Sequence, residues 1–528
     1  MRISRGLTPP TVFILTTFLY VVAFPPLDGA EAAYLFAVPL LVWIFFRPRL
    51  KTFFFTSLAS SFVAWVILLS WLRHVTWEGT VFLAFILGCV LALWFLTAWW
   101  AVPRLVERSF PVRLLGVLGL AGLWVLLEWI RSFAFSGFPW LPLAASQWER
   151  PVLLQLAAWT GAYGVSFLLI FFNLAIAFYL RHLVVHRKEK GWASRFCPEF
   201  YIALGLLLGT IGLFLKTLPR ATDREPFFTA GIVQPYIEQL LKWDAEEAQN
   251  NLDILAQQTT FVELLNPDLI LWPESATPWP IKGDAAMRMW AERFVDELGK
   301  PVLMGNYSHE GDILHNGIFI VNPKGGLSDN YYIKRKLVPF GEYIPLRRFL
   351  PFIEKFVPIA GDFTPGEDAS SLSVEINGKV FRCGSMVCYE DVFPHLARES
   401  AAVGIDFLFV ATNNAWYGEE GGAYQHAAHS VLRAVETRRL VVRCGNGGWS
   451  GWIDEYGRVR HVLTDQRGSI YFRGGELVRM DRDPKWIGRH SFYVRYGDWF
   501  VAVCAGFSLI GFLIASKNGS AKQPVVKN

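Results

Sequence analysis

The stretch "GSMVCYEDVFP", residues 384–394, ends an apolar, strand-like run with a cysteine that is followed at once by Tyr389 and Glu390. Cys388 can be read as a packing residue, as half of a disulfide or as a nucleophile. Ligand sites of α/β sheets usually assemble at the ends of strands, where this cysteine lies. The segments around it decide among the three interpretations.

Residues 226–480 alternate between short β-rich runs and helical patterns. The strand-like runs are "FFTAGIVQP" (227–235), "DLILWPE" (268–274), "KPVLMGNYS" (300–308), "NGIFIVNP" (316–323), "KVFRCGSMVCYE" (379–390) and "IDFLFVATNN" (405–414). Helical spacing is found at 244–265 and 425–439. Because runs this apolar are typical of strands that helices cover, the pattern predicts an α/β layered domain.

Three of the six cysteines belong to this region, namely Cys383, Cys388 and Cys444. An odd number excludes a complete disulfide framework. Cys383 and Cys388 would point to opposite faces if both lay on one strand, which argues against a bond between them. We therefore expect at least one free thiol, and we interpret Cys383 and Cys444 as packing residues.

The chain as a whole is too apolar for a soluble protein, since 53% of all residues are hydrophobic and only 18% are charged. A membrane-spanning helix needs about 20 mostly apolar residues. The sequence predicts about eight spans, at 6–27, 32–46, 52–72, 79–103, 114–130, 151–180, 200–215 and 499–516. An alternative for the first is a cleaved signal peptide, because "AEA" at 30–32 resembles a cleavage site.

Lys and Arg residues are concentrated in alternate loops, which predicts a cytoplasmic N-terminus and places residues 219–497 on the outer face. The same bias explains the net charge of +5, which therefore does not indicate nucleic-acid binding. The predicted organisation is a seven-helix bundle (1–218), an outer domain (219–497), a final span (498–516) and a cytoplasmic tail (517–528).

Three chemically different side chains stand at the ends of strand-like runs. Glu274 ends "DLILWPE", Lys334 follows the Tyr-Tyr-Ile run of "NYYIKRKLVPFGE", and Cys388 ends "GSMVC". Such a set can perform acyl transfer: the carboxylate takes the thiol proton, the thiolate attacks a carbonyl, and the ammonium stabilises the oxyanion. Residue type alone does not select Lys334 over its basic neighbours.

These motifs resemble those of the nitrilase, or carbon–nitrogen hydrolase, superfamily, whose catalytic set is Glu-Lys-Cys. "LWPES", "YIKRKLVPFGE" and "VCYED" match the contexts of its glutamate, lysine and cysteine. "LVPFGEYIPL", together with the membrane segments and "SGFPW" (136–140), is similar to the apolipoprotein N-acyltransferase family. The resemblance covers nearly the whole chain. It implies an α-helical membrane bundle beside a four-layer αββα nitrilase-like domain, with Glu274, Lys334 and Cys388 as the triad.

The resemblance also implies a reaction. An acyl chain passes from a phospholipid to the cysteine as a thioester, and then to the α-amino group of the S-diacylglyceryl-cysteine of an apolipoprotein. The implied setting is the bacterial inner membrane, with the catalytic domain on the periplasmic face. We expect a monomer, because membrane association already covers the apolar spans. The implied mechanism needs no cofactor, and His315, His426 and His429 lack the spacing of a metal site.

Five further residues are assigned supporting roles, Tyr389 by its position directly after the nucleophile and the others by the resemblance. Glu342 is a carboxylate near the cysteine, Asn316 lies near the oxyanion site, and Trp243 handles substrate. The backbone N–H of Tyr389 is a candidate oxyanion donor, and Glu390 has a status similar to that of Glu342. Their structural alternatives are salt bridges for the carboxylates, a turn for Asn316 and a rim aromatic for Trp243.

Two other segments bear on specificity. The apolar, basic loop 346–366 suits contact with lipid headgroups and, in the family, covers the lipid entrance; an ordinary packed loop is the alternative. Asn414 stands where the family commonly has an acid, and 443–451 is also altered. These departures leave the triad untouched and bear on substrate contacts and donor preference.

Two alternative functions remain. A membrane-tethered nitrilase-type amidase would use the same three residues but hydrolyse its acyl-enzyme with water. A transporter with an inert outer domain would show intramembrane charges along a path. Here Glu128 is the only acid well within a predicted span, with Arg131 as its expected partner one turn away.

Overall fold

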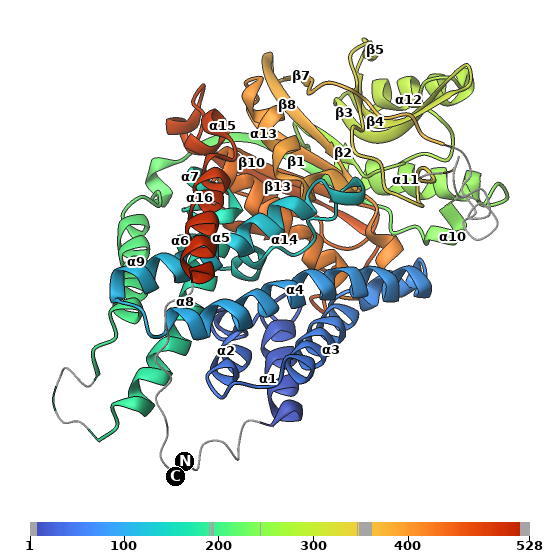
Figure 1. The fold of residues 1–528 in the computed structure, drawn as a ribbon. Coiled ribbons are helices and arrows are strands. Elements are labelled where there is room, and N and C mark those ends of the chain that lie inside the picture. Colours follow the sequence, from blue (N-terminus) through green and yellow to red (C-terminus); the bar gives the residue numbers. More distant parts are fainter. Residues whose placement is uncertain are drawn as a thin grey trace. The chain divides into compact units, whose positions relative to one another are not determined.

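The computed structural model describes residues 8–188, 191, 195–242, 244–345, 347 and 362–517 (Figure 1). The chain divides into two compact units. The first, which we call the helical unit, contains residues 1–156, 160–216 and 498–528. The second, the α/β unit, contains residues 157–159 and 217–497.

Within the described residues of the chain, six helices are long and apolar enough to cross a membrane. They are α3 (Leu50–Leu68), α4 (Trp77–Leu105), α5 (Phe110–Arg131), α8 (Ala162–Val185), α9 (Pro198–Leu215) and α16 (Trp499–Ser516). Shorter helices are α1 (Pro9–Val22), α2 (Val38–Ile44), α6 (Pro151–Leu154) and α7 (Ala157–Thr160). The predicted membrane bundle is confirmed, and six of the eight predicted spans contain such a helix.

Three predicted spans differ from the helices that the structure shows in the same segments. The first two contain α1 and α2, which are 14 and 7 residues long and so shorter than a complete crossing. α1 ends at Val22, and Pro25 and Pro26 follow, where no regular helix hydrogen bond can be donated. The predicted span over 151–180 is interrupted at Gly161, whose φ of +67° ends one helical segment before α8 begins.

The α/β unit contains two sheets among its described residues. The first has the order β13-β1-β2-β3-β4-β5, with β6 paired to β4, and β1, β2 and β3 are parallel. Its strands are β1 (Glu225–Gln234), β2 (Leu269–Trp272), β3 (Val302–Glu310), β4 (Ile313–Asn322), β5 (Gly326–Leu327), β6 (Tyr332–Ile333) and β13 (Gly474–Arg482).

The second sheet has the order β12-β11-β10-β9-β8-β7, and β8, β9 and β10 are parallel. Its strands are β7 (Ser371–Ile376), β8 (Lys379–Val387), β9 (Phe407–Thr412), β10 (Leu440–Gly445), β11 (Gly451–Ile453) and β12 (Val459–Val462). The helices of the unit are α10 (Gln239–Lys242), α11 (Ala248–Glu263), α12 (Ala285–Leu298), α13 (Pro394–Ala402), α14 (Gly422–Thr437) and α15 (Phe492–Tyr496).

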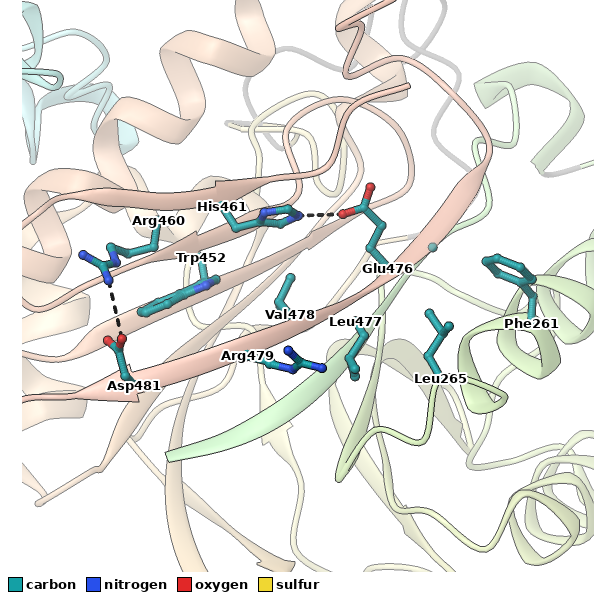
Figure 2. A pocket seen from close by; sticks show the side chains of 11 residues that line it. Phe261, Leu265, Trp452, Arg460, His461, Glu476, Leu477, Val478, Arg479 and Asp481 are labelled. Carbon is teal, nitrogen blue, oxygen red and sulfur yellow. Dashed lines mark hydrogen bonds and ion pairs between the residues drawn. The ribbon is translucent and has the colours of Figure 1, made fainter. Parts of the chain in front are cut away.

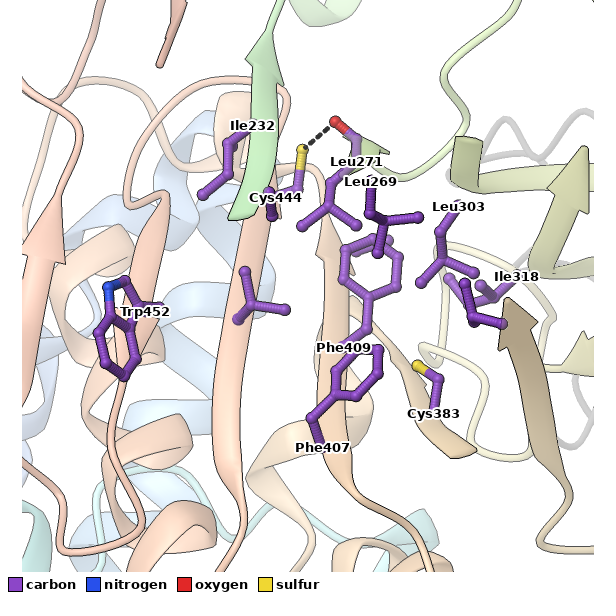
Figure 3. Packing of buried hydrophobic residues seen from close by; sticks show 14 of the residues in the cluster. Ile232, Leu269, Leu271, Leu303, Ile318, Cys383, Phe407, Phe409, Cys444 and Trp452 are labelled. Atoms are coloured by element: carbon purple, nitrogen blue, oxygen red, sulfur yellow. Dashed lines mark hydrogen bonds between the residues drawn. The ribbon is translucent and has the colours of Figure 1, made fainter. Parts of the chain in front are cut away.

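The main core lies between the two sheets, where alternate residues of facing strands interdigitate (Figure 3). Cys383 of β8 and Cys444 of β10 belong to this cluster, and the Cys444 thiol donates to the carbonyl of Leu271 at 3.3 Å. A second cluster packs the outer face of the first sheet against α11 and α12. α13 and α14 contact the second sheet. The predicted α/β layered domain is therefore confirmed.

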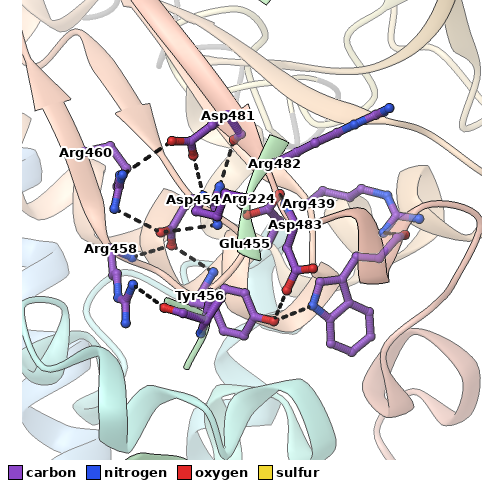
Figure 4. A network of polar contacts seen from close by, with 12 residues as sticks. Arg224, Arg439, Asp454, Glu455, Tyr456, Arg458, Arg460, Asp481, Arg482 and Asp483 are labelled. Atoms are coloured by element: carbon purple, nitrogen blue, oxygen red, sulfur yellow. Dashed lines mark hydrogen bonds and ion pairs between the residues drawn. The ribbon is translucent and has the colours of Figure 1, made fainter. Parts of the chain in front are cut away.

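A buried ionic network joins the edges of the two sheets (Figure 4). Arg224, which precedes β1, donates to Glu455 at 2.9 Å and to the carbonyl of Asp481 at 2.7 Å. Tyr456 donates to Asp483 at 2.6 Å. Because Arg224 and Glu455 are almost fully buried, the network replaces their hydration and fixes β1 and β13 beside the β11–β12 turn.

Candidate active site

Three buried side chains stand where strands of the α/β unit end. Glu274 lies two positions after β2, Lys334 directly follows β6, and Cys388 directly follows β8. Their exposed fractions are 7%, 1% and 7%. The three residue types singled out from the sequence are thus drawn from both sheets and lie in the interior.

Lys334 lies between two carboxylates. Its Nζ is 2.8 Å from Oε1 of Glu342 and 3.4 Å from Oε1 of Glu274. Asn316 Nδ2 donates to the same two oxygens, at 2.9 Å each. Burial alone would lower the pKa of Lys334, but the charges of Glu342 and Glu274 outweigh burial and raise its pKa. The ammonium is therefore held in its charged form.

Cys388 occupies a turn that begins where β8 ends. Its φ of +50° lies in the left-handed region, which a non-glycine residue rarely adopts. Burial raises the pKa of its thiol to about 12, and the Glu274 carboxylate acts in the same direction. Lys334 and the hydroxyl of Thr412, which is 3.3 Å from Sγ, oppose this rise. The resting sulfur is accordingly a protonated thiol that has stabilising groups for a thiolate nearby.

Glu390 connects two of the turns. Its carboxylate accepts hydrogen bonds from the backbone N–H groups of Val387 and Arg335 at 2.7 Å each, and of Lys336 at 3.1 Å. The Tyr332 hydroxyl donates to it at 2.9 Å. One fully buried carboxylate therefore ties the turn after β8 to the turn after β6.

A polar network that was not predicted lies behind the cysteine. His426 of α14 places Nε2 at 3.1 Å from the carbonyl oxygen of Cys388 and 2.7 Å from Asp391. Its Nδ1 lies 3.0 Å from Oδ1 of Asn414. Burial would raise the pKa of Asp391, but His426 and Arg443 outweigh it and hold the pKa well below its usual range. The signal that could have revealed this face is the polar set at 426, 430 and 433 on an apolar helix.

Lys242 is a second buried amine beside Glu274 that was not predicted. Its Nζ donates to the backbone carbonyl of Glu274 at 3.2 Å. Burial lowers the pKa of Lys242 to about 8, and the Glu274 carboxylate only partly offsets this effect. The sequence signal was a single lysine in the apolar run "QLLKW", which by itself suggests nothing more than a surface residue.

Gly305 of β3 lies against the backbone of the glutamate turn. A Cβ at this position would lie 2.7 Å from Cα of Glu274, 2.8 Å from the carbonyl oxygen of Pro273 and 2.9 Å from Cβ of Ala411. The Gly305 carbonyl also accepts from the N–H of Ala276 at 2.9 Å. The absence of a side chain at Gly305 therefore lets Glu274 approach the second sheet.

The remaining predicted residues divide into two groups. The ring of Tyr389 packs edge-on against Phe393, with centroids 5.1 Å apart. Trp243 lies outside the described residues, as does most of the predicted loop at 346–366. All six cysteines lie in the described ranges and none forms a disulfide.

A cavity of about 640 Å³ lies elsewhere in the α/β unit (Figure 2). It is lined by Trp452, by residues of β12 and β13, and by Phe261 and Leu265 near the end of α11. His461 and Glu476 pair across it at 2.6 Å. Neither Glu274 nor Cys388 lines this cavity, so the cavity is not the candidate active site.

In the helical unit, Glu128 of α5 interacts electrostatically with Arg131, as expected from the sequence, but its hydrogen bonds go to other groups. Its Oε1 accepts from the indole N–H of Trp124 and from the N–H of Leu143, at 2.7 Å each. Arg131 instead donates to the carbonyl of Trp140 at 3.3 Å. These contacts join α5 to the segment that follows it.

Comparisons with known proteins cover both units. The model of the apolipoprotein N-acyltransferase N-terminal domain matches residues 16–175, and that of the carbon–nitrogen hydrolases matches residues 229–471. An apolipoprotein N-acyltransferase of Geobacter metallireducens is 32% identical over 520 residues, covering 95% of this chain and 94% of its own. One of Brucella melitensis is 31% identical over 409 residues, covering 74% and 73%. The crystal structure of an amidase from Nesterenkonia sp. is 17% identical with a TM-score of 0.38, covering 53% of this chain and 96% of its own.

Proposed function

The chain belongs to the apolipoprotein N-acyltransferase family, and from this premise we propose that it moves a fatty acyl chain from a phospholipid to the α-amino group of a diacylglyceryl-cysteine on an apolipoprotein. The observation that carries the proposal is the buried set of thiol, ammonium and carboxylate at the ends of β8, β6 and β2. These three groups supply a nucleophile, an oxyanion partner and a base.

In the first half-reaction, Glu274 takes the proton of the Cys388 thiol, and the thiolate attacks the ester carbonyl of the phospholipid. Lys334 stabilises the oxyanion together with the backbone N–H of Tyr389. The ester C–O bond then breaks, the proton on Glu274 passes to the leaving alkoxide, and the thioester remains on Cys388. A lysophospholipid is the first product.

In the second half-reaction, the amine of the apolipoprotein attacks the thioester carbonyl. Its proton passes to Glu274, the C–S bond breaks, and the Cys388 thiolate leaves. Glu274 returns the proton to the sulfur, which restores the resting enzyme. The amide is the second product, and no external oxidant, reductant or cofactor is needed to balance either step.

The supporting residues are assigned from their contacts. Glu342 keeps the Lys334 ammonium charged and in place, and Asn316 holds both carboxylates through one amide. Glu390 keeps the turn of Lys334 next to that of Cys388, and so acts as a positioning residue. For Trp243, which lies outside the described residues, the family resemblance alone supports a role in substrate handling.

The setting is proposed from the charge bias of the loops. The bias supports a bacterial inner-membrane protein whose residues 219–497 face the periplasm, with membrane segments in 1–218 and 498–516. The acyl donor is a membrane lipid and the acceptor carries a lipid anchor, so a catalytic domain at the membrane surface suits both. We propose a monomer, because one chain supplies every group that the reaction uses.

Intact mass spectrometry of the purified full chain tests the proposal. Incubation with phospholipid vesicles and no lipoprotein should add one acyl group, which neutral hydroxylamine removes and which Cys388→Ala does not acquire. An adduct that is stable in water and clears when a diacylglyceryl peptide is added supports acyl transfer. An adduct that clears in water alone supports the amidase instead. A wild-type chain that gains no adduct contradicts both.

A further inference from the structure

Thr412, the last residue of β9, is a fully buried hydroxyl that faces two acceptors. Its Oγ1 lies 3.3 Å from Sγ of Cys388 and 3.0 Å from Oδ1 of Asn414. A threonine hydroxyl carries one proton, so it can donate to only one of them at a time. Which acceptor receives the proton depends on the charge of the sulfur.

The amide acceptor is itself held in place. Asn414 Oδ1 lies 3.0 Å from Nδ1 of His426, and the other ring nitrogen of His426 lies 3.1 Å from the carbonyl oxygen of Cys388. Thr412, Asn414 and His426 thus form a chain of contacts that begins at the Cys388 thiol and ends at the Cys388 carbonyl. Because all of these groups are buried, neither acceptor can be replaced by bulk water.

We propose that Thr412 is a catalytic residue whose hydroxyl donates to Asn414 in the resting enzyme and turns to the Cys388 sulfur when the thiol ionises. The inference rests on the proposed role of Cys388 as the nucleophile. The thiol proton goes to Glu274, whereas the Thr412 proton stays on Oγ1 and only changes its acceptor. When the thioester forms, the sulfur loses its charge and the hydroxyl returns to Asn414.

The same donor serves both half-reactions. A thiolate is the attacking group in the first and the leaving group in the second, so a hydrogen bond made only to the anionic sulfur stabilises both transition states. The neutral thiol and the thioester are weak acceptors, and Asn414 satisfies the hydroxyl in those states. The switch therefore needs both acceptors within reach, and the distances meet this condition.

Other charged and titratable groups also act on the sulfur and must be kept unchanged in a test. They are Glu274 after β2, Lys334 after β6 and Tyr417 in the turn after β9, while His426, with Asp391 and Arg443 beside it, contacts the carbonyl oxygen of Cys388. None of them is altered by a substitution at Thr412. Valine has nearly the shape of threonine and lacks the hydroxyl, so Thr412→Val removes the donor alone.

The test is the rate of Cys388 alkylation by iodoacetamide at one fixed alkaline pH below the thiol pKa, read by intact mass on the full chain, with Cys388→Ser as the labelling control. Thr412→Val should slow this alkylation by about ten- to a hundredfold, because the loss of a hydrogen bond to the thiolate leaves less of the sulfur ionised. It should also slow thioester formation from phospholipid vesicles by roughly tenfold or more. Thr412→Ser keeps the hydroxyl and should return both values close to those of the wild type.

A second variant separates the switch from damage to the fold. Asn414→Ala removes the resting acceptor and should speed the alkylation of Cys388 at the same pH, opposite to Thr412→Val. A wild-type alkylation rate in Thr412→Val, or a change of the same sign in both variants, overturns the proposal. A wild-type chain that alkylates at Cys388 but never forms the thioester instead overturns the nucleophile assignment, so the two failures are distinguishable.

Discussion

Gly305→Ala should displace Glu274 without removing any reacting group. The added Cβ would lie 2.7 Å from Cα of Glu274, whereas non-bonded carbon atoms prefer about 3.5 Å or more. Relief requires the glutamate turn to move by about 0.8 Å, because the contacts are with backbone and Ala411 and no flexible side-chain end can yield. Overpacking of this kind costs about 1 to 3 kcal/mol of stability.

The kinetic effect should be larger than the effect on stability. A misplacement of about 1 Å can cost roughly a hundredfold in rate, since proton transfer depends on the position of the base. The assay is the rate at which one acyl group appears on Cys388 after mixing with phospholipid vesicles, followed by intact mass. Iodoacetamide labelling of Cys388 at high pH shows whether the thiol is still accessible.

Gly325→Ala is the matched control. Its Cβ would meet nothing closer than Cβ of Asn322 at 3.4 Å, which is ordinary contact. We expect this variant to acylate at the wild-type rate. If Gly305→Ala also acylates within about threefold of the wild type, then a displaced glutamate turn does not limit the reaction, and the argument from Gly305 is refuted.

Three further perturbations probe the charges of the α/β unit. Glu274→Gln removes a charge that raises the pKa of the Cys388 thiol, so iodoacetamide should label Cys388 faster at pH 8 while acylation by phospholipid is lost; slower labelling contradicts this assignment. Lys242 has a pKa of about 8 against 10.5 when unfolded, so the unfolded chain binds more protons between these values and stability should rise with pH there. Lys242→Met should abolish that rise and increase the free energy of unfolding by about 3 kcal/mol at neutral pH. A variant whose thermal unfolding depends on pH in the same way as that of the wild type contradicts this prediction. Arg224→Leu leaves buried carboxylates such as Glu455 unpaired and should cost about 3 kcal/mol, whereas a wild-type Tm contradicts a structural role for the network.

The sequence was sufficient to predict the layered domain and the three groups at its strand ends. The runs that contain Glu274 and Cys388 are apolar and end in polar residues, and the structure ends β2 and β8 within two residues of them. Lys334 was different, because it has two basic neighbours and only the family motif identified it as the candidate catalytic lysine. Its burial between Glu342 and Glu274 results from the tertiary fold and cannot be read from any local sequence pattern.

The groups behind the cysteine could not be predicted for a similar reason. Thr412 reaches the sulfur because β9 pairs in parallel with β8, and His426 reaches the same turn because α14 packs beside it. Register and helix packing bring together residues that are far apart in the chain. The interruption at Gly161 was missed because composition shows that a segment is apolar without showing where its backbone leaves the helix.

Because Cys388 has a left-handed backbone conformation, different inactive variants at this position should differ in stability. A φ of +50° costs an L-amino acid about 1 to 2 kcal/mol relative to glycine, and alanine has the same penalty as cysteine. Cys388→Gly should therefore melt at a higher temperature than Cys388→Ala, although both lack the thiol. Glycine would be the better background for capturing an unreacted acyl donor. At this one position, selection for folding and selection for catalysis favour different amino acids.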